Sequence, residues 1–212
     1  MTRARAEHWD RTYTGCSADD LSWYEDEPRT SLELINTLGV DPGDAVVDVG
    51  GGQSLLVDAL VDHGFSDLTV LDVSAVALGI SADRVGSAAH VEWVVADVVD
   101  WEPSRKYTLW HDRAVLHFLV DPEDRAQYLR TLTRAVGSGS VVLATFAPDG
   151  PDSCSGLPVV RYGPDDLATL LDGFDVVEAR RVTHVTPWST EQPFTYVAAR
   201  SQAQPPAGAR WT

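Results

Sequence analysis

Cysteine is scarce in this chain, and long apolar runs are absent. Only Cys16 and Cys154 occur among 212 residues, and neither stands in a CxxC or other metal-ligand spacing. The six histidines form no metal-binding pattern either. No run approaches the ~18 apolar residues of a membrane span, and residues 1–8 lack the apolar core of a secretion signal. We therefore expect a cytoplasmic protein with no membrane span, no structural disulfide and no metal.

Positive charge is also in short supply. Lysine and arginine number 16 against 32 aspartates and glutamates, which gives a net charge of −16. Nonspecific binding to nucleic acid or to an anionic membrane needs positive potential, so the charge argues against both partners. An acidic surface could favour a basic acceptor, or it could simply keep the molecule solvated.

The chain instead shows regular alternation of strand-like and helix-like segments. The length suits one domain, expected over residues 1–201, and 44% hydrophobic residues suffice for a sizeable core. Such alternation predicts a doubly wound α/β fold, a mostly parallel sheet with helices on both faces. Strands are expected at 45–50, 67–73, 90–96, 107–112 and 140–146, and helices at 5–13, 28–39, about 55–63, 75–85, 122–136 and 164–171.

Three regions depart from this rhythm. Residues 1–40 read as a helical cap that precedes the first strand, with Pro28 at the first helical position. Residues 147–163 form a long loop rich in Pro, Gly and Ser, expected on the substrate side as a lid or as disordered chain. Strands 174–185 and 193–201 have no helix between them, so they should pair as a C-terminal antiparallel hairpin. The tail 202–212 should be disordered.

Acidic residues and glycines gather at the ends of three predicted strands. The first strand runs into Asp48-Val49-Gly50-Gly51-Gly52, the second ends at Asp72 and the third at Asp97. A glycine turn lets a ligand approach the backbone, and Asp72 could accept hydrogen bonds from both ribose hydroxyls. The dinucleotide fingerprint GxGxxG fails because Leu55 stands at its third glycine. A nucleoside site is favoured, with a structural turn, a helix cap at Asp72 and a turn aspartate at Asp97 as alternatives.

These motifs resemble class I, Rossmann-like methyltransferases that depend on S-adenosylmethionine (SAM). The family's acid-x-Gly-x-Gly-x-Gly motif is matched up to Ser54, which replaces the last glycine. The resemblance implies a seven-stranded sheet of order 3-2-1-4-5-7-6 with strand 7 antiparallel. It also implies SN2 transfer of the SAM methyl group, which leaves S-adenosylhomocysteine (SAH). The cofactor residues implied are Asp48, Gly50, Gly51, Gly52, Asp72, Val73, Asp97 and Val98.

A finer resemblance lies in residues 110–128, around the fourth strand. This segment is similar to one in thiopurine methyltransferase-like enzymes and to one in small lysine methyltransferases. The resemblance implies that Asp112 and Arg113 line the reaction centre and that His111 lies near the sulfonium or the adenine. It further implies an aromatic lid over SAM formed by Trp9, Tyr13 and Trp23, which could otherwise be core aromatics.

The acceptor is left open by the sequence. A small molecule is favoured, with a protein side chain such as lysine as the alternative and a non-catalytic nucleotide-binding protein as a distant third. His117 could serve as a base, or it could be a packed histidine. In the 147–163 loop, Cys154 and Arg161 are candidates for binding the acceptor. A monomer or a dimer fits the chain equally well.

Overall fold

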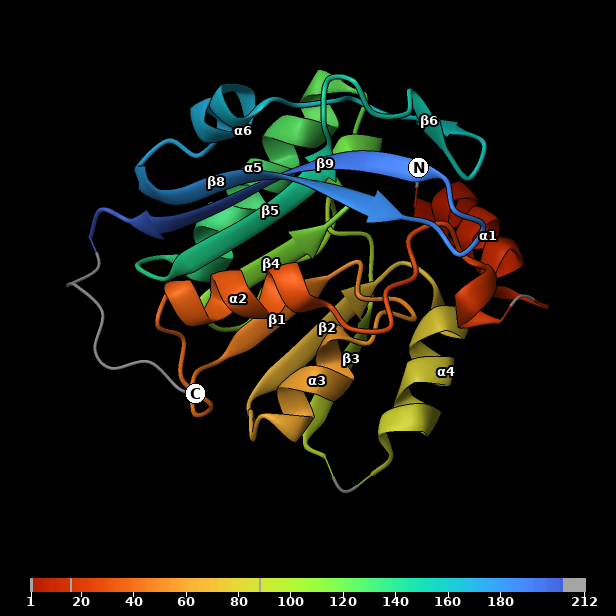
Figure 1. Ribbon diagram of the computed structural model, residues 1–212. Coiled ribbons are helices and arrows are strands. Elements are labelled where there is room, and N and C mark those ends of the chain that lie inside the picture. The colour runs from red at the N-terminus through yellow and green to blue at the C-terminus, as the bar shows by residue number, and fades with distance from the viewer. Residues whose placement is uncertain (1, 16, 88, 204–212) are drawn as a thin grey trace.

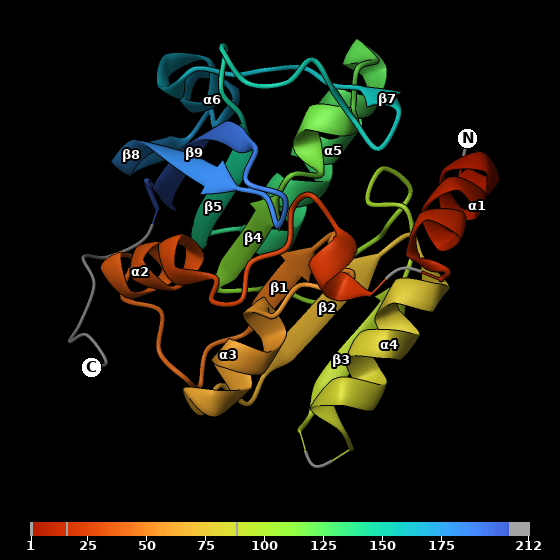
Figure 2. The ribbon, with the colours of Figure 1, turned by 45° about the vertical axis from the view of Figure 1, so that its right-hand side comes forward.

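A seven-stranded sheet with helices on both faces forms the molecule (Figures 1 and 2). The computed structural model describes residues 2–15, 17–87 and 89–203. Cys16 and most of the tail expected to be disordered, from residue 204 onward, lie outside the described residues. The strand order is β3-β2-β1-β4-β5-β9-β8. Since β8 and β9 are the sixth and seventh strands of the sheet, this confirms the expected order and the α/β class.

Six strands run in one direction, and β9 runs opposite to them, between β5 and β8. β1 and β2 are buried along their whole length, as strands covered on both faces must be. The last two strands form the expected hairpin, and β9 also pairs antiparallel with β5. The bounds are β1 Val46–Val49, β2 Leu68–Asp72, β3 Val91–Val95, β4 Leu109–Arg113, β5 Ser140–Phe146, β8 Phe174–Val185 and β9 Glu191–Ser201.

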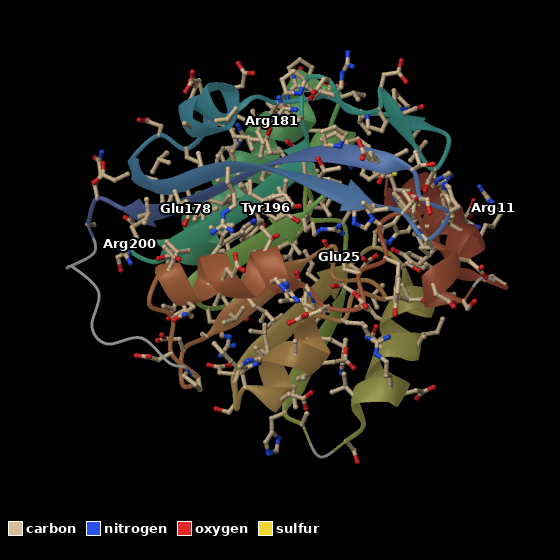
Figure 3. All side chains as sticks on the ribbon, in the orientation of Figure 1. Arg11, Glu25, Glu178, Arg181, Tyr196 and Arg200 are labelled. Atoms are coloured by element: carbon tan, nitrogen blue, oxygen red, sulfur yellow. The ribbon has the colours of Figure 1, made fainter. Side chains whose placement is uncertain are left out.

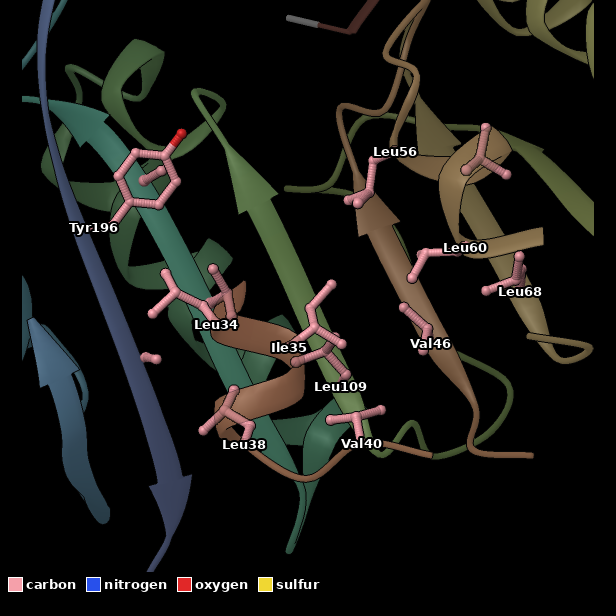
Figure 4. Close-up of a cluster of buried hydrophobic side chains, with 14 of the residues drawn as sticks. Leu34, Ile35, Leu38, Val40, Val46, Leu56, Leu60, Leu68, Leu109 and Tyr196 are labelled. Atoms are coloured by element: carbon pink, nitrogen blue, oxygen red, sulfur yellow. The ribbon is translucent and has the colours of Figure 1, made fainter. Parts of the chain in front are cut away.

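Each sheet face carries its own apolar layer. On one face, α2 (Arg29–Thr37), α3 (Leu56–Asp62) and α4 (Ala75–Val85) pack against β1, β2 and β4. Figure 4 shows Leu34 and Ile35 of α2 beside Leu109 of β4. On the other face, α5 (Pro122–Val136) and α6 (Pro164–Leu170) cover β4, β5 and β9. Alternate residues of each central strand therefore belong to different layers.

Three sequence predictions need correction in detail. Pro28 is the N-cap of α2, one residue before its predicted place. The last strand, β9, begins at Glu191, two residues before its expected start, so Pro193 lies inside it and its carbonyl accepts from the Ala147 N–H. The 147–163 segment contains a small hairpin, β6 (Ser153–Cys154) paired with β7 (Leu157–Pro158). Local pairing of two-residue strands leaves too weak a pattern for a sequence to reveal.

The carboxyl ends of the parallel strands meet at one edge of the sheet. The N-terminal helix α1 (Thr2–Tyr13) lies at this edge, next to the start of α4 (Figure 2). The β6–β7 hairpin and the turn between β8 and β9 also reach it (Figure 1). Open α/β sheets bind ligands at this edge, beside the strand where the order reverses, which here is β1.

Candidate functional site

The glycine turn after β1 is closed so tightly that side chains have no room. Gly50 has φ +69°, and a Cβ on it would lie 1.9 Å from the Val115 side chain. At Gly51 a Cβ would lie 2.7 Å from Asp48 Oδ2, and at Gly52 2.7 Å from the Tyr13 hydroxyl. The turn therefore needs glycine both for its backbone conformation and for its close neighbours.

Three hollows surround this turn, and Gly50 lines all of them. They enclose about 520, 460 and 490 Å³ of space, their open mouths included. We call them the polar hollow, between the turn and β4; the β2–β3 hollow, at the tips of those strands; and the aromatic hollow, under α1. One elongated ligand could occupy the first two and present its middle to the third.

The polar hollow contains buried polar atoms that have no hydrogen-bond partner among the described residues. His111 holds Asp48 in place, since its Nδ1 lies 2.7 Å from Asp48 Oδ1 and its Nε2 lies 2.9 Å from the Ser31 hydroxyl. Asp48 Oδ2 and Gln53 Nε2 are buried beside it with no hydrogen-bond partner. A buried, unpaired acceptor and donor are costly unless a ligand satisfies them.

Arg113 lies on the wall between the polar and aromatic hollows. Its Nε donates to the Tyr196 hydroxyl at 3.0 Å, and its Nη1 donates to the Trp23 carbonyl at 2.9 Å. Nη2 lies 3.1 Å from Glu25 Oε1 as an ion pair, without the geometry of a hydrogen bond. Figure 3 labels Glu25 and Tyr196, which reach Arg113 from opposite ends of the chain. Arg113 thus fastens the N-terminal segment to β9.

Asp72 is the buried acid between the β2–β3 and aromatic hollows. Burial raises its pKa to about 7, and the nearby Asp48 adds to the effect, against hydrogen bonds from the backbone of Ser74, Gly52 and Val73. A buried carboxyl with a pKa near neutrality, in a hollow, is typical of a functional group. Asp97 lies across the same hollow, where it contacts the Arg5 guanidinium and accepts from the Val99 N–H at 3.1 Å. Val73 and Val98 complete its walls.

Aromatic side chains from four parts of the chain line the third hollow. Trp9 lies edge-to-face against Phe118 and Trp23, with ring centroids 5.1 and 5.8 Å apart. The ring centroids of Tyr13 and Trp23 are 6.1 Å apart. Burial, with Asp72 nearby, raises the pKa of Tyr13 well above its ordinary value, so its phenol stays neutral. The sequence suggested three of these rings, and the structure adds Phe118, Phe146 and Phe194.

His117 is buried in the wall of the aromatic hollow. Burial, together with the Arg113 charge, lowers its pKa to about 3, so the ring is neutral at physiological pH. Its Nδ1 accepts from the Phe146 backbone N–H at 3.4 Å, which places the proton on Nε2. Nε2–H is buried without a partner. The ring can therefore donate a hydrogen bond to a ligand.

Asp112 faces away from all three hollows. Its oxygens accept from the backbone N–H groups of Val115 and Leu116 and from the Tyr128 hydroxyl. Burial raises its pKa to about 6, against those hydrogen bonds. Adjacent strand residues point to opposite faces, and here Asp112 turns towards Tyr128 of α5 while Arg113 turns towards Trp23 and Tyr196. Strand alternation could have revealed this from the sequence.

The remaining candidates divide between the hollows and the surface. Cys154 lines the aromatic hollow, and burial raises the pKa of its thiol, which therefore stays protonated. Arg161 is exposed, lines none of the three hollows and donates to the Gly150 carbonyl. Sequence reasoning missed Gln53, although it directly follows the glycine turn. It also missed Arg5, Glu25 and Phe194, which only the tertiary fold brings to the site.

Fold and site together define an α/β protein built to bind a nucleoside-bearing ligand at the carboxyl edge of its sheet. Residues 47–144 match the sequence model of a protein family described as "Methyltransferase domain". A mouse "eEF1A lysine and N-terminal methyltransferase" is 26% identical over 142 residues, which cover 65% of this chain and 20% of that protein. The curated relatives are matched over 20% to 60% of their own lengths. Residues 47–144 thus match the methyltransferase-domain family, and the sheet order and the site agree with the class I SAM-dependent methyltransferases.

Two solved structures share the fold of this chain. The N-methyltransferase NodS from Bradyrhizobium japonicum, in complex with SAH, gives a TM-score of 0.73 at 17% identity and covers 93% of this chain and 98% of its own. A 1,6-didemethyltoxoflavin-N1-methyltransferase from Burkholderia thailandensis gives 0.66 at 19% identity, with coverage of 94% and 85%. Among the described residues, no helix is long and apolar enough to cross a membrane.

Proposed function

We propose that this enzyme transfers the SAM methyl group to a small-molecule nucleophile bound in the aromatic hollow. The observation that carries the proposal is the meeting of the polar, β2–β3 and aromatic hollows at Gly50. When bound, SAM supplies a methyl group on a sulfonium, which a nucleophile can attack directly. The protein then has to hold the two reactants in line, which can provide most of the rate enhancement.

The unpaired buried atoms of the polar hollow fit the methionyl end of SAM. Asp48 Oδ2 offers an acceptor to the ammonium, and Gln53 Nε2 offers a donor to the carboxylate. The His111 and Ser31 hydrogen bonds keep the Asp48 carboxylate from turning away. His111 therefore positions Asp48. Both residues line the polar hollow and not the β2–β3 hollow.

The β2–β3 hollow fits the adenosine. Ionised Asp72 would accept from the ribose hydroxyls, and Asp97 would accept from the adenine amino group. Leu71, Val98 and Leu119 provide apolar walls for the ring. The aromatic rings of Trp9, Tyr13 and Trp23 would lie near the sulfonium, where their faces favour a cation.

The groups around the aromatic hollow favour an acceptor whose nucleophilic atom is already free of a proton. His117 is neutral with its proton on Nε2, Cys154 is a protonated thiol, and Asp112 points to the other face. Among the described residues of the hollow, only Asp72 could take up a proton near neutral pH, and the ribose would engage it. A thiolate or an aromatic ring nitrogen needs no base at the site, and Nε2–H of His117 could donate to a neighbouring atom of such a molecule.

A protein lysine is the second candidate acceptor. The mouse relative carries the name of a lysine methyltransferase, and the net charge of −16 would attract a basic partner. A lysine ammonium would have to lose its proton beside Arg113, which the residues of the hollow do not assist. The geometry therefore favours the small molecule.

A screen for SAH release tests the proposal. Purified enzyme with SAM is offered aryl thiols, heteroaromatic nitrogen compounds, alkyl amines and a lysine-rich peptide pool. We expect turnover with one of the first two classes. His117→Phe should then lower kcat/KM for that acceptor roughly 10- to 100-fold, while SAH affinity stays unchanged. His63→Gln, on the exposed end of α3, serves as the control. Turnover of the peptide pool alone would reject the small-molecule proposal.

A further inference from the structure

Arg5 of α1 joins two acids that are far apart in the chain. Its Nη1 donates to Asp97 Oδ2 at 2.9 Å and also contacts Oδ1, while its Nη2 donates to Asp124 Oδ2. Asp97 follows β3, and Asp124 lies in the first turn of α5. The two-armed guanidinium is suited to bridging two carboxylates. α1 is therefore tied to the end of β3, beside the β2–β3 hollow in whose wall Arg5 lies, and to the start of α5.

Both acids are nearly inaccessible to solvent. Asp97 is 5% exposed and Asp124 7% exposed, so each would be an uncompensated buried charge without the arginine. Burial lowers the pKa of Arg5, but Asp97 and Asp124 outweigh it, and the pKa stays above its ordinary value. The bridge thus keeps three charged groups fixed at the mouth of the hollow.

A second polar contact holds α1 one turn further on. Asp10 Oδ1 accepts from the Ser74 hydroxyl at 2.7 Å and from the Val76 N–H at 3.3 Å, at the start of α4. Trp9 lies between the two contacts and packs against Phe118, which lines both the β2–β3 and the aromatic hollows. Displacement of α1 would open both hollows at once.

We propose that Arg5 is a cofactor-positioning residue: through Asp97 and Asp124 it clamps α1 over the β2–β3 hollow and couples cofactor binding to docking of the N-terminal helix. This rests on the proposed binding of adenosine in that hollow. Asp97 then serves both the Arg5 guanidinium and the adenine amino group. Asp124 lines none of the three described hollows, so it acts only through Arg5.

Calorimetry with SAH on the full chain distinguishes this clamp from a direct contact between Arg5 and the ligand. Arg5→Ala and Asp124→Asn should each weaken SAH on the order of tenfold, and the double variant should be little weaker than either single variant because one interaction is removed only once. Arg5→Lys keeps the charge but loses the second arm, so it should regain part of the affinity. Arg3→Ala removes an exposed pair with Glu7 on the same helix and should bind as the wild type does.

Hydrogen exchange gives a second readout that a merely structural role would not change. SAH should slow exchange in residues 8–24 of the wild type, and much less in Asp124→Asn, with equal thermal midpoints for the two proteins without ligand. Wild-type affinity in Asp124→Asn, loss in Arg5→Ala alone, or no recovery in Arg5→Lys would each overturn the clamp. Failure of the wild-type protein to bind SAH would instead overturn the proposed function.

Discussion

At the level of single residues, a charge that suits the proposed ligand can lower the stability of the protein without it. Asp72 shows this most clearly. Its folded pKa of about 7 exceeds the ordinary 3.8. Its contribution to stability is therefore complete below pH ~4 and is lost as pH rises towards 7. Above pH 7 the folded protein holds a buried negative charge that the ribose hydroxyls can use. In the proposed complex, the charge that would accept from the ribose also weakens the fold when no ligand is bound.

We therefore expect opposite effects of Asp72→Asn on stability and on binding. At pH 8, without ligand, urea unfolding should show a gain of roughly 1–3 kcal/mol, and the gain should fade as pH is lowered towards 5. Calorimetry at pH 8 should show SAH binding weakened by about 1.5–3 kcal/mol. Asp58→Asn, on the surface pair with Arg84, is the control. Loss of stability at pH 8 in Asp72→Asn would contradict the assigned pKa.

The sequence located the strand-end acids but not their surroundings. Asp48, Asp72 and Asp97 follow from the rule that parallel strands end at a common edge. For Asp112 the family resemblance implies a place at the reaction centre, whereas its oxygens accept from Val115, Leu116 and Tyr128 on the face covered by α5. The free Nε2–H of His117 arises because its Nδ1 accepts from the N–H of Phe146, 29 residues away, and no local sequence pattern predicts such a contact.

Among the elements, the glycine turn after β1 leaves little room for a side chain. Gly50→Ala combines φ +69° with a Cβ 1.9 Å from Val115. Either the Val115 side chain or the turn must shift, and φ is unfavourable for alanine, so we expect SAH binding to be lost and the thermal midpoint to fall. Gly79 of α4 is exposed, and its Cβ would meet nothing within 4 Å. Gly79→Ala should therefore stabilise the protein by roughly 0.5–1 kcal/mol, as measured by urea unfolding. Equal behaviour of the two variants would contradict the turn's packing.

Element positions were more predictable than their ends and partners. Hydrophobic periodicity gave all seven strands of the sheet, and the missing crossover helix gave the β8–β9 hairpin. The β6–β7 hairpin escaped prediction because two-residue strands have no period to detect. The docking of α1 also escaped, because its anchors are Arg5 and Asp10, which look like ordinary surface residues of a polar helix.

At the scale of the whole molecule, the ligand site gathers residues from both ends of the chain. Arg5 of α1 and Phe194 of β9 line hollows that share Gly50. Arg113 adds a direct tie between the N-terminal segment and β9 through Trp23, Glu25 and Tyr196. A ligand that bridges these hollows should stabilise the sheet, the N-terminal helix and the last strand together, and not one local segment.

SAH should therefore raise the midpoint of a single cooperative thermal transition. At a hundredfold excess over Kd, binding to the folded state adds about 2.7 kcal/mol. For a chain of this size that corresponds to a shift of roughly 5–10 °C. NADH also carries adenosine, but its pyrophosphate meets a turn with Leu55 in place of glycine and a molecule of net charge −16, so it should cause no shift. Scanning calorimetry with each ligand decides between them. A shift with NADH and none with SAH would overturn the assignment of the hollows, and a second transition that ignores SAH would show that the two ends of the chain are not joined through the site.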